Sequence, residues 1–132
     1  MMISTKGRYA LKIMIDLAEN TGERPVSIKS ISGRQDISVE QIISSLVKSD
    51  LVKSVRGSQG GYFLTRCPKD YSVGEILRAA EGGISPVECV SADKTPCEKE
   101  NICLLRPLWE ELDEAVNKVL DSHSLADLMC RN

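Results

Sequence analysis

The chain has 132 residues, a formal net charge of −2, and 42% hydrophobic and 27% charged side chains. This length is enough for one domain with a real core. The opening MMISTKGRYALK contains no apolar signal run, and no stretch has the apolar length to cross a bilayer, so we expect a cytoplasmic protein with no membrane partner. His123 is the single histidine, and no convincing Ser-His-Asp or Cys-His arrangement is found around it, so we predict no enzyme.

The charge is distributed unevenly along the chain. Residues 1–67 carry ten basic and six acidic side chains, a balance of +4, so residues 68–132 carry −6. This division indicates that the basic first half of the chain faces a polyanion, whereas the acidic second half faces something else.

Three helices are predicted in the first half of the chain. Apolar side chains at helical spacing predict the first helix over residues 5–20. Ser27 is a candidate N-cap for a short second helix, which the polar residues 33–36 end. We expect the third helix to start at Ser38, which has capping-box spacing to Gln41, with apolar positions 39, 42, 43, 46 and 47 on one face.

A hairpin and three further helices follow. Residues 51–55 and 62–64 are predicted strands, joined by a glycine-rich loop. Ser72 and Glu75 form a second capping-box pair that opens a helix to about residue 80, before Gly82 and Gly83 stop it. After irregular residues 84–102, a long helix over 104–121 has a continuous apolar side, and a short helix follows Ser124.

This order predicts a mainly α fold with a small β-hairpin wing, that is, a winged helix-turn-helix plus a long dimerisation helix. We expect residues 1–81 to form the DNA-binding region, 82–103 a cysteine-bearing loop, and 104–132 the dimerisation helix with a short C-terminal helix. The long apolar side needs a partner to cover it, so we predict a homodimer.

The third predicted helix and the wing carry the candidate DNA contacts. Glu40 can accept from cytosine, Gln41 can pair with adenine, and Arg56 can enter a narrow minor groove. Each feature alone is also typical of a solvated helix face or an ordinary glycine turn; the two in succession favour DNA. The candidate DNA-binding residues are Ser38, Glu40, Gln41, Ser44, Ser45, Lys48, Arg56, Ser58, Gln59 and Gly60.

Three of the five cysteines are candidate metal ligands. Cys89, Cys97 and Cys103 are separated by seven and five intervening residues, whereas Cys67 and Cys130 lie outside this cluster. An odd number of cysteines in a cytosolic chain argues against a disulfide framework. The gaps are wider than in zinc sites and fit an iron–sulfur cluster better. Three unrelated thiols are the alternative, and no fourth ligand is identified.

Several segments together resemble the IscR-type family of iron–sulfur cluster regulators over nearly the whole chain. They are STKGRYALKIMIDLA, ISGRQDIS, LVKSVRGSQGGYFL, SVGEILRAAEG and the cysteines followed by CLLRPLWEEL. The resemblance implies a homodimer, a [2Fe–2S] or related cluster on Cys89, Cys97 and Cys103, and control of iron–sulfur assembly or cysteine genes.

The chain departs from the family pattern at three places. Arg106 stands where a histidine is expected after the last cysteine, and Arg8 stands where related sensors have an acidic ligand. The segment just before Glu40 is a few residues shorter than the pattern.

The sequence therefore predicts a transcription regulator that senses cluster or redox status and binds a palindromic site in double-stranded DNA. One alternative is a cluster-free regulator of the same fold, controlled by a partner protein or by cysteine oxidation. An alternative of another class is a small metal- or cluster-carrier protein that does not bind DNA.

Overall fold

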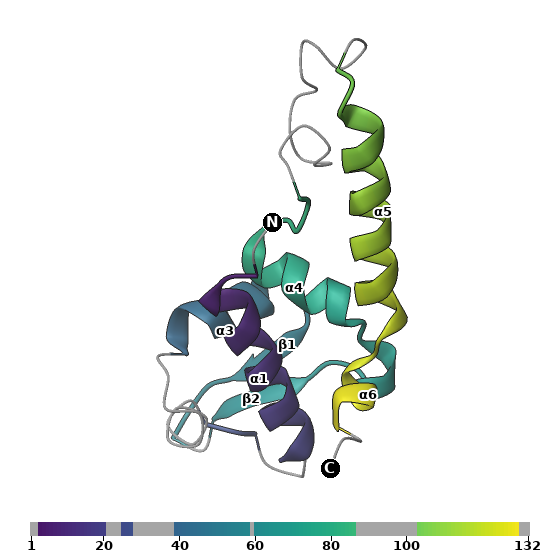
Figure 1. Ribbon diagram of the computed structural model, residues 1–132. Coiled ribbons are helices and arrows are strands. Elements are labelled where there is room, and N and C mark those ends of the chain that lie inside the picture. The colour runs from purple at the N-terminus through teal and green to yellow at the C-terminus, as the bar shows by residue number, and fades with distance from the viewer. Residues whose placement is uncertain (1–2, 21–24, 28–38, 59, 87–102, 130–132) are drawn as a thin grey trace.

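The structure, a computed structural model, describes residues 3–20, 25–27, 39–58, 60–86 and 103–129 (Figure 1). A helical body carries a two-stranded hairpin, and the long helix α5 projects from it (Figure 1). The elements are α1 (Thr5–Glu19), α3 (Glu40–Lys48), β1 (Val52–Val55), β2 (Gly61–Leu64), the 3₁₀ turn η1 (Pro68–Asp70), α4 (Val73–Glu81), α5 (Arg106–Ser122) and α6 (Leu125–Met129). The predicted second helix lies outside the described residues.

The core lies where α1, α3 and α4 meet. Ile13 and Leu17 of α1 are buried against Ile43 and Leu46 of α3 and Ile76 of α4. For α1 and α3 these are positions at which the apolar periodicity placed the inner faces, so the predicted amphipathic character of these two helices is confirmed.

Helix α3 is described from Glu40, with Val39 in the N-cap position, close to the predicted start at Ser38. Val39 is fully buried and has near-helical backbone angles, and its carbonyl accepts a hydrogen bond from the Ile43 N–H at 2.8 Å. Ser38, on which the predicted capping box depends, lies outside the described residues.

The hairpin was predicted to within one residue at each strand and is attached to the segment after α1. The strands β1 and β2 pair antiparallel, with Val55 opposite Gly61 at the turn. Val26 makes a bridge to Tyr62 through two backbone hydrogen bonds of 3.0 and 2.8 Å. A Cβ at position 61 would overlap the Val26 carbonyl oxygen, so the glycine allows this third piece of chain to pair with β2.

A buried tyrosine joins the hairpin to the helices. The Tyr71 side chain is fully buried, and its hydroxyl donates to the Leu51 carbonyl at 2.7 Å. The same oxygen accepts from the backbone N–H groups of Thr65 at 2.8 Å and Arg66 at 3.1 Å. The Arg66 guanidinium also lies 4.6 Å from the centre of the Tyr71 ring. One side chain therefore satisfies the backbone where β1 begins and where β2 ends.

Helix α4 has both predicted end signals. Ser72 and Glu75 form the reciprocal capping box, and Gly82 ends the helix in the left-handed conformation with φ of 78°. Arg78 holds α5 by donating to both carboxylate oxygens of Asp121 at 2.9 Å. A Cβ at position 74 would overlap the Asp121 carboxylate, so Gly74 permits this close approach.

The two C-terminal helices largely follow the prediction. Helix α5 begins at Arg106, two residues later than expected, with Pro107 in its first turn, where its missing N–H costs nothing. Ser124 and Asp127 bond reciprocally at the start of α6. The hydrogen bonds from Ser124, and to a smaller degree the charge of His123, hold the pKa of Asp127 below its ordinary value. None of the described helices is long and apolar enough to span a membrane.

We expect Tyr71→Phe to lower the free energy of unfolding by about 1–3 kcal/mol, since it removes the hydrogen bonds that the buried hydroxyl makes to the Leu51 carbonyl and to the Thr65 N–H. Urea denaturation followed by circular dichroism measures the loss. Tyr62→Phe is the matched control, because this hydroxyl makes no hydrogen bond within the described residues, and we expect a change within about 0.5 kcal/mol. Equal effects of the two substitutions would contradict the role given to Tyr71.

Candidate nucleic-acid interface and cysteine segment

Helix α3 presents a polar face opposite its buried one. Glu40, Gln41, Ser44 and Lys48 are exposed. Ser45 is half-buried, and its hydroxyl donates to the Gln41 carbonyl at 3.3 Å. The exposed face thus combines a carboxylate, an amide, a hydroxyl and an ammonium group, which are the groups that read base edges and contact phosphates.

The wing loop, residues 56–60, is shaped by two glycines. Arg56 and Ser58 are exposed, and Gly57 has a φ of 112°, which L side chains rarely adopt. The Gly60 N–H donates to the Gly57 carbonyl at 2.9 Å, and a Cβ at position 60 would overlap the Val55 carbonyl oxygen. Gly60 therefore shapes the turn, while Arg56 and Ser58 are the side chains offered to a ligand. Gln59 lies outside the described residues.

Helix α3 and the wing form one rigid unit. Asp50 reverses the chain after α3 with a φ of 60°, and the Leu51 N–H donates to the Leu46 carbonyl at 3.0 Å. Thr65, just after β2, donates its hydroxyl to the Asp50 carbonyl at 2.9 Å. Short connections and side-chain bonds therefore set the angle between the polar face of α3 and the wing.

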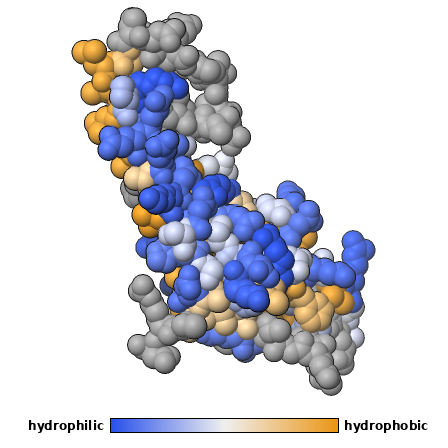
Figure 2. Space-filling view, turned by 90° about the vertical axis from the view of Figure 1, so that its right-hand side faces the viewer, coloured by the Kyte–Doolittle hydropathy of each residue, from blue (hydrophilic) through white to orange (hydrophobic). Residues whose placement is uncertain are grey.

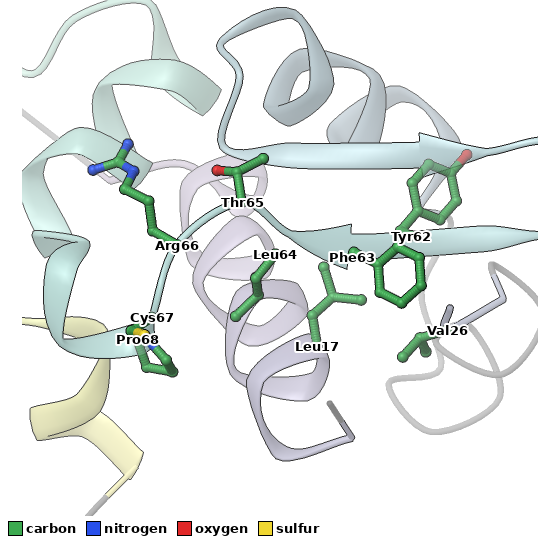
Figure 3. Close-up of a pocket in the computed structure, with 9 residues that line it drawn as sticks. All are labelled: Leu17, Val26, Tyr62, Phe63, Leu64, Thr65, Arg66, Cys67 and Pro68. Carbon is green, nitrogen blue, oxygen red and sulfur yellow. The ribbon is translucent and has the colours of Figure 1, made fainter. Parts of the chain in front are cut away.

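An apolar pocket of about 370 Å³ lies between the hairpin and α1. Leu17, Val26 and Leu64 line it, and Cys67 and Pro68 stand at one end (Figure 3). The Arg66 side chain points away from this pocket (Figure 3). Its guanidinium contacts the Glu75 carboxylate at 3.2 Å. The lining residues carry no set of acid, base and nucleophile.

The structure describes one of the three predicted cluster ligands. Cys103 is half-buried and lies just before α5, whereas Cys89 and Cys97 lie outside the described residues. Cys67 is exposed beside η1 at the other end of α5, whose 17 residues span roughly 25 Å. Within the described ranges, no three His, Cys, Asp or Glu side chains are grouped to hold a metal.

The basic residues that replace the expected ligands are engaged elsewhere. Arg106 donates from its Nε to Glu110 at 2.7 Å, and Arg8 contacts the Thr5 hydroxyl at 3.4 Å. The sequence reasoning also missed Asp16, which is 3% exposed on α1 and accepts a hydrogen bond from Asn20 at 3.3 Å. Its position between Ile13 and Leu17, among the buried positions of α1, was the signal in the sequence that could have indicated its burial.

A polar helix face followed by a rigid glycine hairpin on a small helical body defines a DNA-binding domain of the winged-helix class. A family model described as Rrf2, iron-dependent transcriptional regulator, matches residues 3–131. The chain belongs to the Rrf2 family of transcriptional regulators. This confirms the predicted fold class, the regulatory function and the resemblance to the IscR-type regulators.

Named relatives match over nearly the whole chain. The HTH-type transcriptional regulator CymR of Bacillus subtilis is 47% identical over 131 residues, 97% of this chain and 89% of the relative. The HTH-type transcriptional regulator IscR of Aliivibrio salmonicida is 38% identical over 135 residues, 100% of this chain and 79% of the relative. A solved structure of CymR, titled the global cysteine regulator of B. subtilis, superposes with a TM-score of 0.75 at 46% identity, covering 98% and 96% of the two chains. Because these relatives are regulators, the prediction of no enzyme is confirmed.

We expect Arg56→Ala to weaken binding to a duplex selected by the unmodified protein by about 1–3 kcal/mol, because a guanidinium at the base of the wing would be lost from a groove or phosphate contact. Fluorescence anisotropy at several salt concentrations measures it. Lys118→Ala, which removes an exposed cation from α5, is the control and should leave the affinity unchanged. Unchanged affinity of the Arg56 variant at every salt concentration would refute this role.

Proposed function

We propose that this regulator binds double-stranded DNA through α3 and the wing, as a homodimer paired through α5, and senses iron–sulfur or thiol redox status through Cys89, Cys97 and Cys103. The observation that carries the proposal is that short connections and hydrogen bonds join α3 to the wing, and that both elements present exposed polar and basic side chains. We infer a cytoplasmic location, because a DNA-binding regulator acts at the chromosome.

The DNA contacts divide between the two parts of the unit. Glu40, Gln41 and Ser44 stand on the exposed face of α3, where they reach base edges in the major groove. Arg56 and Ser58 contact the adjacent backbone or minor groove from the wing. The predicted DNA-binding residues also include Ser38, Ser45, Lys48, Gln59 and Gly60, of which Ser45 and Gly60 are half-buried and act by shaping the helix and the turn.

The homodimer is inferred from an apolar face of α5 that the chain leaves uncovered. Leu105, Leu108 and Val119 are 55%, 52% and 56% exposed, and Leu112 is on the same side. Hydrophobic residues gather along one edge of the projecting helix in Figure 2. Positions 105, 108, 112 and 119 follow the alternating spacing of three and four residues that pairs helices side by side. A second copy covers such a face with its own identical one.

The single apolar side predicted for α5 divides into two faces. Trp109, Val116 and Leu120 are half-buried, and Leu120 packs against the small cluster of Val73, Leu77 and Ile84 in the body. Leu120 therefore belongs to the fold of one chain, and the pairing surface is the more exposed outer row. A two-fold dimer places two reading units in inverted orientation, which fits a palindromic site.

We expect Leu108→Glu and Leu112→Glu each to raise the dimer dissociation constant by roughly tenfold or more, because burying an apolar side chain of this size contributes about 1.5–3 kcal/mol. Sedimentation velocity over a range of concentrations measures the change. Glu111→Gln, an exposed change off the apolar row, is the control. Sedimentation of the unmodified protein as a monomer would refute the dimer.

The sensing role is assigned to the segment 82–103 that joins α4 to α5. Three cysteine thiolates are suitable ligands for iron, and a bound iron–sulfur cluster, such as [2Fe–2S], supplies a redox-active centre. Cys103 lies three residues before the start of the pairing helix α5, so ligation there acts close to its first turn. The fourth ligand is unassigned, because Arg106 and Arg8 occupy the two positions that would have supplied it.

A cluster-free version of the same regulator is the second candidate. The relative titled the global cysteine regulator favours control of cysteine metabolism genes, whereas the resemblance to the IscR-type family implies control of iron–sulfur assembly genes. Reversible oxidation of the same cysteines would then replace cluster binding as the signal. A carrier protein is disfavoured, because cargo delivery gives no use to the α3 face and the wing.

Replacing Cys103, Cys89 or Cys97 with alanine should remove the visible absorption and the bound iron of anaerobically purified protein, since each thiolate is a ligand. Cys67→Ala is the matched control and should keep both. Full iron and sulfide content in all four variants would exclude the cysteine trio. A colourless unmodified protein that still binds DNA would favour the cluster-free regulator.

A further inference from the structure

The first turn of α1 is capped by a residue from far along the chain. Ser4 occupies the N-cap position but its side chain does not bond to its own helix. Instead, the Glu81 carboxylate oxygen Oε1 accepts from the Ser4 N–H at 3.1 Å, from the Ser4 hydroxyl, and from the Gly7 N–H at 2.9 Å. A carboxylate on the free N–H groups of a helix start is favoured by hydrogen bonding and by the helix dipole.

Gly7 makes room for this carboxylate. A Cβ at position 7 would overlap Glu81 Oε1, and Gly7 is buried inside α1. Glycine within a helix costs about 1 kcal/mol relative to alanine, so the chain accepts a local loss at this position. The gain is a three-bond contact between the first turn of α1 and the last residue of α4.

Glu81 also stands where the cysteine segment leaves the body. It is the last residue of α4, and Gly82 turns the chain toward residue 84 and the cysteines beyond. On its other sides α1 contacts α3 and β2, the elements that carry the proposed DNA surface. The Glu81 carboxylate thus lies between the sensing segment and the helix that supports α3.

We propose that Glu81 is a positioning residue that couples the cysteine segment to the DNA surface, through its seat on α1 at Gly7. The coupling rests on the proposed sensing function. A displacement of the C-terminal end of α4 by the cysteine segment moves the carboxylate, and α1 follows because three of its first-turn donor groups are held by that one oxygen. Since α1 packs on α3 and β2, the displacement reaches both reading elements.

The first test compares DNA affinity in two states of the full chain. Protein reconstituted with iron and sulfide, and protein treated with a chelator, are titrated by anisotropy with a duplex selected from a random pool. Coupled sites typically change affinity by about 5–150-fold, and we expect Glu81→Ala to bring this ratio to within about twofold of one. Glu81→Gln keeps a carbonyl acceptor in place and should retain most of the ratio.

Ser124→Ala separates coupling from simple loss of stability. It removes the cap of α6, a comparable loss of roughly 1 kcal/mol, and should leave the affinity ratio unchanged. A Glu81→Ala variant with the same ratio as the unmodified chain would overturn the proposal.

The second test does not depend on sensing. If the unmodified chain binds DNA equally in both states, the sensing function fails, and Glu81 is then judged by hydrogen exchange alone. We expect Glu81→Ala to speed exchange about fivefold in the first turn of α1 and also in α3, as loss of a helix cap predicts. Faster exchange confined to residues 3–8, or equal changes in the Ser124→Ala variant, would overturn the coupling.

Discussion

The buried hydroxyl of Tyr71 fixes the hairpin to the helical body. It bonds Leu51 before β1 and Thr65 and Arg66 after β2, so both ends of the hairpin are held by one oxygen atom. Because a buried backbone group without a partner costs about 1–3 kcal/mol, these bonds leave the strands little freedom to shift. The angle between α3 and the wing, on which the proposed mode of DNA binding depends, follows from this constraint.

Helix α4 is joined to its two neighbours by the same device. A carboxylate from one helix fits into the space that a glycine leaves in another, Glu81 at Gly7 of α1 and Asp121 at Gly74 of α4. The first contact joins α4 to α1 and the second joins it to the C-terminal end of α5. The N-terminal part of α5 has no such anchor within the described residues and keeps its apolar row exposed (Figure 2).

Signals that are local in sequence predicted this fold well. The Ser72–Glu75 capping box, the glycine after α4 and the hairpin are set within a few residues, and they were found. The same spacing at Ser38 and Gln41 stays a prediction, because Ser38 lies outside the described residues. The contact of Glu81 with Gly7 spans 74 positions and has no local signature, so only the folded chain reveals it. The sequence likewise could not divide the apolar side of α5 into two faces, because that division depends on where α4 lies.

In the proposed regulator, the segment that carries the cysteines joins two helices that are already fastened to each other. It follows α4 after Glu81 and precedes α5 at Cys103, while the bond of Arg78 to Asp121 fastens the far end of α5 back to α4. The start of α5 therefore lies roughly 20 Å along the helix from that fastening. In the proposed coupling, a change in this segment would act both on the start of α5 and on the carboxylate seated against α1, so pairing through α5 and reading through α3 would respond to the same change.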